Sequence, residues 1–231
     1  MIDWHSHVLP AMDDGSRNLE ESLGMLKLLR EQGVRRVIAT PHFYANDEDV
    51  NRFLERRTEA FCRLEPALTD EHPQVLCGAE VRYYPGIGRM ADLDKLVIGS
   101  TKLLLLEMPF SKWTDYTMKE LTELASYGRL TIILAHIDRY LKFQNSATWN
   151  KLLECGFLMQ VNASFVYEFA TKGKARKMLS EGKIHFIGSD CHNLTSRPPR
   201  IGEAYSQIQK KFGDDFVANM TGYGHYKLKH N

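Results

Sequence analysis

Short apolar runs alternate with amphipathic segments along most of this 231-residue chain. Each run has the length of a buried strand, and the segments between the runs carry their apolar residues on one helical face. Strands and helices in regular alternation favour a parallel sheet, and right-handed crossovers close such a series into a barrel. The sequence therefore predicts an α/β fold, a distorted (β/α)7 TIM-like barrel. Its seven strands are expected at residues 2–5, 36–40, 74–80, 102–107, 130–135, 158–161 and 184–188.

The chain is long enough for one α/β domain, and no linker, repeat or low-complexity tract divides it. We expect a single barrel domain over residues 1–231, with helices that include residues 115–127 and 201–212. The last segment, residues 221–231, contains Gly222 and Gly224. Because glycine disfavours a helix and chain ends are often poorly held, this segment is expected to be a loosely held tail.

Metal-binding residue types stand where six of the seven predicted strands end. Taken singly, each has a structural explanation: Glu80 could pair with Arg82, and His42 could cap a helix. In a barrel, however, the carboxyl ends of the strands form one face, and that face carries the active site. The residues at these ends are His5, His7, His42, Glu80, Glu107, His136, Asp190 and His192.

Carboxylates and imidazoles that converge on one face repel or desolvate one another unless cations neutralise them. These side chains offer nitrogen and oxygen atoms and no thiolate, and they exceed the ligand number of one tetrahedral zinc ion. The pattern therefore predicts a cluster of two or three metal ions.

The charge, the cysteines and the hydropathy exclude several protein classes. Thirty basic against 29 acidic residues give a net charge of +1, which lacks the basic excess of a general nucleic-acid binder. The four cysteines are widely spaced and form no C-x-x-C pair, which indicates reduced thiols. The apolar run at residues 103–106 is too short to span a membrane, and cleavage of an N-terminal signal would remove His5 and His7. We therefore expect a cytoplasmic protein without membrane insertion and without a nucleic-acid partner.

Six short motifs stand at the ends of the predicted strands: His5-Ser6-His7, Thr40-Pro41-His42, Gly78-Ala79-Glu80, Leu106-Glu107, His136-Ile137-Asp138-Arg139 and Gly188-Ser189-Asp190-Cys191-His192. Together with residues 8–15, these motifs resemble the PHP (polymerase and histidinol phosphatase) superfamily. Within it, the chain resembles the CpsB/YwqE group, bacterial protein tyrosine phosphatases of capsule and exopolysaccharide loci. The resemblance extends from residue 2 to about residue 200 and implies the PHP form of the barrel.

The resemblance implies a site for three metal ions and adds Asp14 to the ligands. The first ion would be held by His5, His7, Glu80 and Asp190, the second by Glu80, Glu107 and His136, and the third by Asp14, His42 and His192. Manganese is the first expectation, and iron, zinc and cobalt also suit imidazole and carboxylate ligands.

Such a site supports metal-assisted hydrolysis of phosphomonoesters. Arg139 and Arg197 are candidates to bind the phosphoryl group, because a guanidinium matches its oxygens. The resemblance implies a phosphotyrosine protein as substrate, namely the tyrosine-rich tail of a bacterial tyrosine autokinase that controls polysaccharide export. Two alternatives stay open. One is another PHP phosphoesterase, a histidinol-phosphate phosphatase or a nuclease-like enzyme; the other is a non-catalytic, metal-stabilised module that docks a kinase.

Cys191 and Arg197 also satisfy the Cys-x5-Arg spacing of thiol-dependent tyrosine phosphatases. A phosphate-binding loop of that kind needs successive backbone N–H groups that point inward, usually with the help of glycine. No glycine lies between these two residues. Because Cys191 stands between two candidate ligands on an extended segment, its side chain is expected to point away from theirs. The sequence therefore favours the metal over the thiol.

Overall fold

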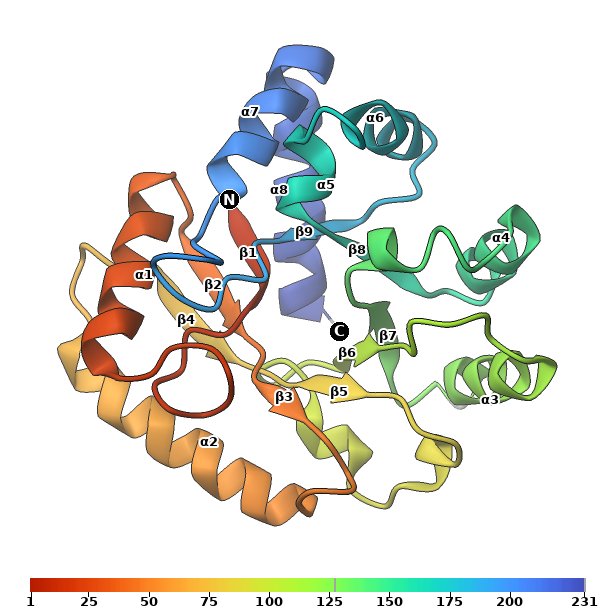
Figure 1. Ribbon diagram of the computed structural model, residues 1–231, viewed down its shortest axis with the longest axis horizontal. Helices are drawn as coiled ribbons and strands as arrows, with labels where there is room; N and C mark the ends of the chain where they lie inside the picture. The colour runs from red at the N-terminus through yellow and green to blue at the C-terminus, as the bar shows by residue number, and fades with distance from the viewer. Residues whose placement is uncertain (127, 231) are drawn as a thin grey trace.

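The computed structural model describes residues 1–126 and 128–230, and its strands form a curled parallel sheet surrounded by helices (Figure 1). Each strand pair in this part of the chain is parallel, as the alternating pattern predicts. The strands are β1 (Ile2–Ser6), β2 (Arg36–Ala39), β3 (His42–Phe43), β4 (Gln74–Cys77), β5 (Glu80–Arg82), β6 (Leu103–Glu107), β7 (Thr131–Leu134), β8 (Leu158–Asn162) and β9 (Phe186–Gly188).

Two of the predicted strands are each divided into two short ones. The break between β2 and β3 lies at Pro41, which has no N–H to donate to a neighbour. The break between β4 and β5 lies at Gly78, whose carbonyl accepts a hydrogen bond of 2.7 Å from the Arg57 side chain. The pairing still runs past both breaks, because the N–H of Glu80 donates to the Pro41 carbonyl at 3.0 Å. Each divided strand therefore holds one position in the sheet.

The two ends of the sheet meet, which confirms the predicted barrel. The strands pair in the orders β1-β2-β4 and β3-β5-β6-β7-β8-β9. At the closure, the N–H of Asp190 donates to the His5 carbonyl at 2.8 Å, and the N–H of His7 donates to the Cys191 carbonyl at 2.9 Å. Within the described residues, the strands thus occupy seven positions of a distorted ring.

The helices cover the outside of this ring (Figure 1). Asn18 caps the first one, since its side chain accepts the N–H of Glu21. The helix expected at residues 115–127 ends at Ser126, and Tyr127 lies outside the described residues. The helices are α1 (Leu19–Glu31), α2 (Val50–Leu64), α3 (Asp115–Ser126), α4 (Ser146–Glu154), α5 (Ala163–Tyr167), α6 (Lys172–Ser180), α7 (Ile201–Phe212) and α8 (Asp214–His230), with short 3-10 turns η1 (Glu65–Ala67), η2 (Ile87–Arg89), η3 (Leu93–Leu96) and η4 (Ile137–Arg139).

Side chains alternate between two cores along the strands. On β6, Leu104 and Leu106 belong to the large core between the sheet and the helices, whereas Leu103 and Leu105 belong to a smaller core inside the ring. All four are fully buried, as expected for a strand covered on both faces. Glu107 follows Leu103 and Leu105 on the inner face of β6 and is the last residue of the strand. Its carboxylate therefore lies at the carboxyl end of the ring.

The expectation of a loosely held tail is wrong for the described residues 221–230. These residues belong to α8, which runs from Asp214 to His230 behind the ring in Figure 1. Tyr223 stacks on Phe186 with ring centroids 5.9 Å apart, and Leu228 also packs on the inner core. A Cβ on Gly224 would lie 3.0 Å from Trp4, so this glycine permits close packing of α8 on the barrel. The helix therefore covers the end of the ring opposite the candidate ligands.

In the described part of the chain, no helix combines the length and the apolar character that crossing a membrane requires.

Candidate metal centre

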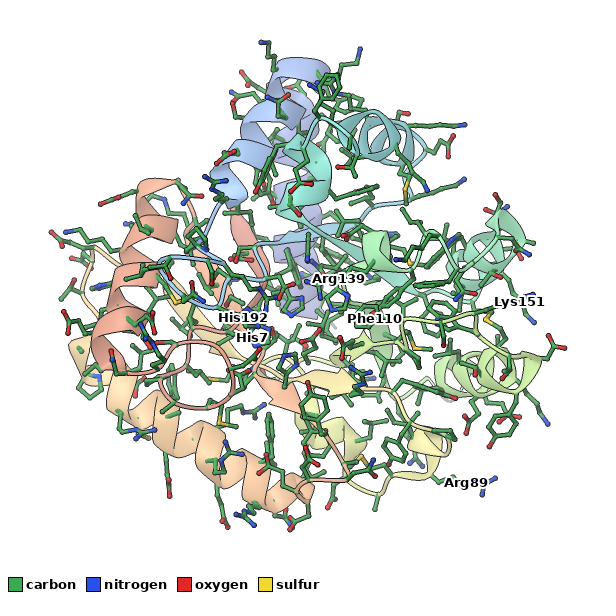
Figure 2. The ribbon with its side chains drawn as sticks, viewed as in Figure 1. His7, Arg89, Phe110, Arg139, Lys151 and His192 are labelled. Atoms are coloured by element: carbon green, nitrogen blue, oxygen red, sulfur yellow. The ribbon has the colours of Figure 1, made fainter. Side chains whose placement is uncertain are left out.

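All nine candidate ligands lie together at the carboxyl ends of the strands, at the centre of Figure 2, where His7 and His192 are labelled. Most of them are buried; His42 is half-buried, and Asp14 is exposed. Buried ionisable groups at this density require compensation of their charge. The ligands that reach the site from the strand ends come from almost every position of the ring.

Glu80 is the central carboxylate of the cluster. Its Oε1 lies 2.7 Å from His136 Nε2, and its Oε2 lies 2.9 Å from His42 Nδ1. The same Oε2 lies 3.3 Å from His5 Nε2 and 3.6 Å from His7 Nε2. One carboxylate therefore faces four imidazoles, which is the arrangement expected of a bridging ligand.

The ligand atoms form four overlapping groups, each with its atoms within 4.8 Å of one another. One group contains the expected third set and adds His7 to it. Two further groups, which share His5, together contain most of the other expected ligands. The groups are His7, Asp14, His42 and His192; His5, His7 and Asp190; His5, Glu80 and His136; and His42, Glu80 and Glu107.

Four of the five rings turn Nε2 toward the cluster, because Nδ1 of each has a partner on the other side. The Nδ1 atom of His7 lies 2.6 Å from Asp13 Oδ2, and that of His5 lies 3.4 Å from the Gln160 amide oxygen. A proton that Nδ1 donates to such a partner leaves the lone pair of Nε2 free for a cation. The other two partners are the Asp190 carbonyl, 3.0 Å from His192 Nδ1, and the Tyr140 hydroxyl, 3.1 Å from His136 Nδ1.

The pKa values of His5 and Glu80 show that carboxylates and imidazoles stabilise each other's charges inside the cluster. Burial alone would lower the pKa of His5, but the Glu80 and Asp190 carboxylates raise it to about 9. Burial would likewise raise the pKa of Glu80, but the charge of His5 and the neighbouring imidazoles hold it well below its usual range. Protonated imidazoles neutralise the carboxylates here, and a bound metal ion would have the same effect.

His192 shows that the residues fit a metal. Its Nε2 is buried and has no hydrogen-bond partner among the described residues, and it lies 3.4 Å from Asp14 Oδ1. Burial and the nearby His7 lower the pKa of His192 to about 4, so the ring is neutral at pH 7. An unpartnered lone pair next to a carboxylate is the donor set that divalent transition metals bind.

Comparison with known proteins decides the family. The model of the family described as "Capsular polysaccharide synthesis, CpsB/CapC" matches residues 1–226 of the chain. The chain belongs to the CpsB/CapC family. This result confirms the CpsB/YwqE resemblance seen in its motifs.

Two curated relatives of this CpsB/CapC protein are tyrosine-protein phosphatases by name. The chain is 33% identical to CpsB of Streptococcus agalactiae serotype III (strain NEM316), over 93% of this chain and 92% of that protein. It is 31% identical to YwqE of Bacillus subtilis (strain 168), over 96% of this chain and 89% of that protein.

Solved structures agree with these matches. One chain from the crystal structures of YwqE from Bacillus subtilis and CpsB from Streptococcus pneumoniae, named there as unique metal-dependent tyrosine phosphatases, superimposes with a TM-score of 0.85. It is 28% identical, and the match covers 100% of this chain and 95% of that one. The putative histidinol phosphatase of Listeria monocytogenes, 13% identical with a TM-score of 0.53, shares the fold alone.

The residues that hold the ligands of this CpsB/CapC chain in place were not identified from the sequence. Asp13 accepts N–H groups from Gly15 and His42 at 2.9 Å each, in addition to its contact with His7. Gln160 and Asn162 stand at alternate positions of β8, and the Asn162 amide donates to Asp190 at 2.9 Å. The alternation of Gln160 and Asn162 is the one sequence signal that could have indicated these supports.

Arg82 pairs with Glu107 and not with Glu80, which was one structural explanation for Glu80. The Arg82 and Glu107 side chains approach to 2.9 Å. The register explains this choice, because β5 pairs with β6 so that Arg82 stands opposite Glu107, while Glu80 stands opposite Leu105. The Glu80 carboxylate therefore contacts the histidines of the cluster and not Arg82.

Backbone strain coincides with the candidate ligands. Outside glycine, the described residues with positive φ are Ala11 (55°), His136 (30°) and Asp190 (53°). Two of these are candidate ligands, and Ala11 lies in the loop that carries Asp14. Such conformations cost on the order of 1–3 kcal/mol each and persist where the surroundings enforce them, often at functional sites.

Both candidate phosphate-binding arginines reach the centre. The Arg139 guanidinium forms a short ion pair with Asp190 Oδ2, and Arg197 Nη2 lies 2.9 Å from Asp190 Oδ1. Their side chains are 37% and 40% exposed, against 4% for Asp190. The two guanidinium groups therefore stand at the rim of the buried cluster, where part of each faces solvent.

The thiol of Cys191 points away from this rim, as expected from its place on the strand end. Cys191 is 1% exposed and packs in the outer core between the sheet and the helices. Burial and the Asp3 carboxylate raise the pKa of the thiol far above its usual range. A nucleophilic cysteine needs the opposite, an accessible thiolate.

Proposed function

We propose that this protein is a metal-dependent phosphatase that removes phosphate from phosphotyrosine in proteins of capsule or exopolysaccharide synthesis. The observation that carries the proposal is the convergence of nine imidazole and carboxylate side chains around Glu80. The names of the curated relatives and of the matching crystal structures support the same activity.

We propose the following ligands. His5, His7, Glu80 and Asp190 hold the first metal ion, Glu80, Glu107 and His136 the second, and Asp14, His42 and His192 the third. The proximity groups support this division, since Asp14, His42 and His192 fall into one of them. Manganese is the expected metal, and iron, zinc or cobalt would also suit the nitrogen and oxygen donors.

Bound divalent cations would neutralise the carboxylates, polarise a phosphoryl group and acidify water to the hydroxide that attacks phosphorus. Arg139 and Arg197 bind the phosphoryl oxygens through N–H groups that face solvent at the rim. A phenolate leaves more readily than an alkoxide, because the pKa of tyrosine is near 10. No protein nucleophile takes part, and Cys191 is buried away from the site.

The proposed substrate is the tyrosine-rich tail of a tyrosine autokinase, and the proposed location is the cytoplasm. The capsule family and the phosphatase names of the relatives support this choice. An extended tyrosine-rich tail can bring a phosphotyrosine to a site at the open end of a barrel.

Metal analysis combined with chelation tests the proposal. Fully active protein should contain at least two equivalents of metal, lose hydrolysis of a phosphotyrosine peptide on chelation and regain it with Mn²⁺. His136→Ala should abolish activity, while His72→Ala, at a loop histidine whose Nδ1 faces Thr69, should not. Preference for histidinol phosphate or single-stranded DNA over the peptide would refute the substrate class. Full activity with less than two equivalents of metal would refute the cluster.

A further inference from the structure

Phe110 is a large apolar side chain that stands exposed beside the metal centre. It lies in the loop after β6, three residues beyond the candidate ligand Glu107, and it is 42% exposed. Figure 2 shows it next to Arg139 and far from the peripheral Arg89 and Lys151. An exposed aromatic ring at the rim of a charged cluster borders the space that a bound ligand would occupy.

The ring of Phe110 is held in place on one side. Its centroid lies 5.4 Å from that of Tyr140 and 6.0 Å from that of His136, and the interplanar angle with His136 is 25°. The loop is fixed at both ends, since the N–H of Met108 donates to the Tyr140 hydroxyl at 3.0 Å and the Trp113 indole donates to the Pro109 carbonyl at 3.1 Å. One part of the ring therefore packs on the site while the rest faces solvent.

Two guanidinium groups lie near the same ring. The Cζ atoms of Arg82 and Arg139 each lie 6.0 Å from the Phe110 centroid. Arg82 binds Glu107 and Arg139 binds Asp190, so both cations are tied to candidate metal ligands. The ring thus lies near two positive groups that border the site. A ligand with an anionic head and an aromatic body matches this arrangement.

We infer that Phe110 is a specificity-determining residue that contacts the aromatic ring of an aryl phosphate while its phosphoryl group occupies the metal centre. The inference rests on the proposed phosphatase function and adds the residue that separates aryl from alkyl phosphates. Aromatic pairs prefer offset or edge-to-face contact, and the exposed part of Phe110 offers either. Loss of this contact should weaken aryl binding on the order of tenfold.

Binding of two non-hydrolysable phosphonates to the metal-loaded protein tests the inference. Phenylphosphonate and methylphosphonate share the anionic head and differ in the aromatic body, so leaving-group chemistry does not enter. The parent protein should bind phenylphosphonate more tightly. Phe110→Ala should lose most of that preference and keep its affinity for methylphosphonate, and Phe110→Tyr should retain the preference. Metal content, measured for each variant, should stay unchanged.

Phe169→Ala is the matched control. Phe169 is 88% exposed and lies near a cation, with Lys172 Nζ 4.8 Å from its ring, but it belongs to the turn between α5 and α6. This variant should bind both phosphonates as the parent does. Should Phe110→Ala disturb the loop, Phe110→Leu keeps apolar bulk there and should lose the aryl preference all the same.

The outcomes separate the inference from the function on which it rests. If the parent protein binds neither phosphonate at its metal centre, the proposed function fails. If it binds phenylphosphonate more tightly and Phe110→Ala and Phe110→Leu keep that preference, or lose affinity for both phosphonates equally, Phe110 has no role in specificity and the inference is overturned.

Discussion

Replacing Gly188 by alanine should disturb the closure of the barrel and the metal centre together. A Cβ at this position would lie 2.5 Å from His5 Cβ, 2.7 Å from Gln160 Nε2 and 3.0 Å from the His5 backbone N. Carbon atoms pack at about 3.5–4.0 Å, so β1 and β9 would have to separate by roughly 1 Å. The added methyl group thus acts on the strand that carries the first candidate ligand.

The cost follows from this displacement. Overpacking of a dense interior costs about 1–3 kcal/mol in the free energy of unfolding, and we expect the upper part of this range because two of the contacts involve backbone or Cβ atoms. His5 Nε2 is 3.3 Å from Glu80 Oε2, and metal–ligand distances tolerate only about 0.2 Å. The variant should therefore bind less metal and lose phosphatase activity on the order of 100-fold.

Urea denaturation, metal analysis and kinetics on a phosphotyrosine peptide measure these effects. Gly173→Ala is the control, since a Cβ there would meet nothing within 4 Å and the residue lies in α6. That change should stabilise the protein by about 0.5–1 kcal/mol and leave the metal content alone. Unchanged stability, metal content and activity in Gly188→Ala would refute the packing of β1 against β9 on which this reasoning rests.

Two further changes probe the thiol and the covered end of the barrel. Cys191→Ser should keep its metal-dependent activity, because the thiol is buried in the outer core; loss of activity with full metal content would favour the thiol mechanism. Burial, with a smaller effect from Lys227, lowers the pKa of His185 to about 4. As the pH falls from about 6.5 toward 4, the unfolded chain binds a proton at His185 and the folded protein does not, so the free energy of unfolding decreases. The loss should approach about 3 kcal/mol, measured as the pH dependence of unfolding relative to His185→Gln; a constant difference between the two proteins would contradict the assignment.

Local patterns predicted the parts of the molecule that depend on local rules. The strands follow from apolar runs, and the candidate ligands follow from the residue that ends each strand, because parallel strands bring their carboxyl ends to one face. Asp13 and Tyr140 escaped this reasoning. Their partners His136 and His7 lie only four and six residues earlier, but neither pair lies within one α-helix or strand, so no helical or strand periodicity indicates these contacts.

The C-terminal helix shows how packing overrides propensity. Gly222 and Gly224 lower the intrinsic helix preference, which is why a loose tail is the natural expectation. In the structure, Gly224 lies against Trp4 and Ile2, and Tyr223 stacks on Phe186. The contact with the inner core compensates for the weak propensity. It depends in part on Ile2 and Trp4, more than 200 positions away, which the local sequence does not specify.

The closure between β1 and the segment after β9 also constrains the order of events during synthesis. β1 gains its first neighbour early, since Ile2 pairs with Arg36. Its other edge finds its partner only when Asp190 and Cys191 have formed their hydrogen bonds with His5 and His7. Until then a growing chain exposes an unpaired strand edge, a state prone to association with other chains. Asp190 and His192 belong to that last segment. The complete set of ligands therefore forms only when the barrel closes, and metal binding stabilises the closed barrel and does not guide early folding.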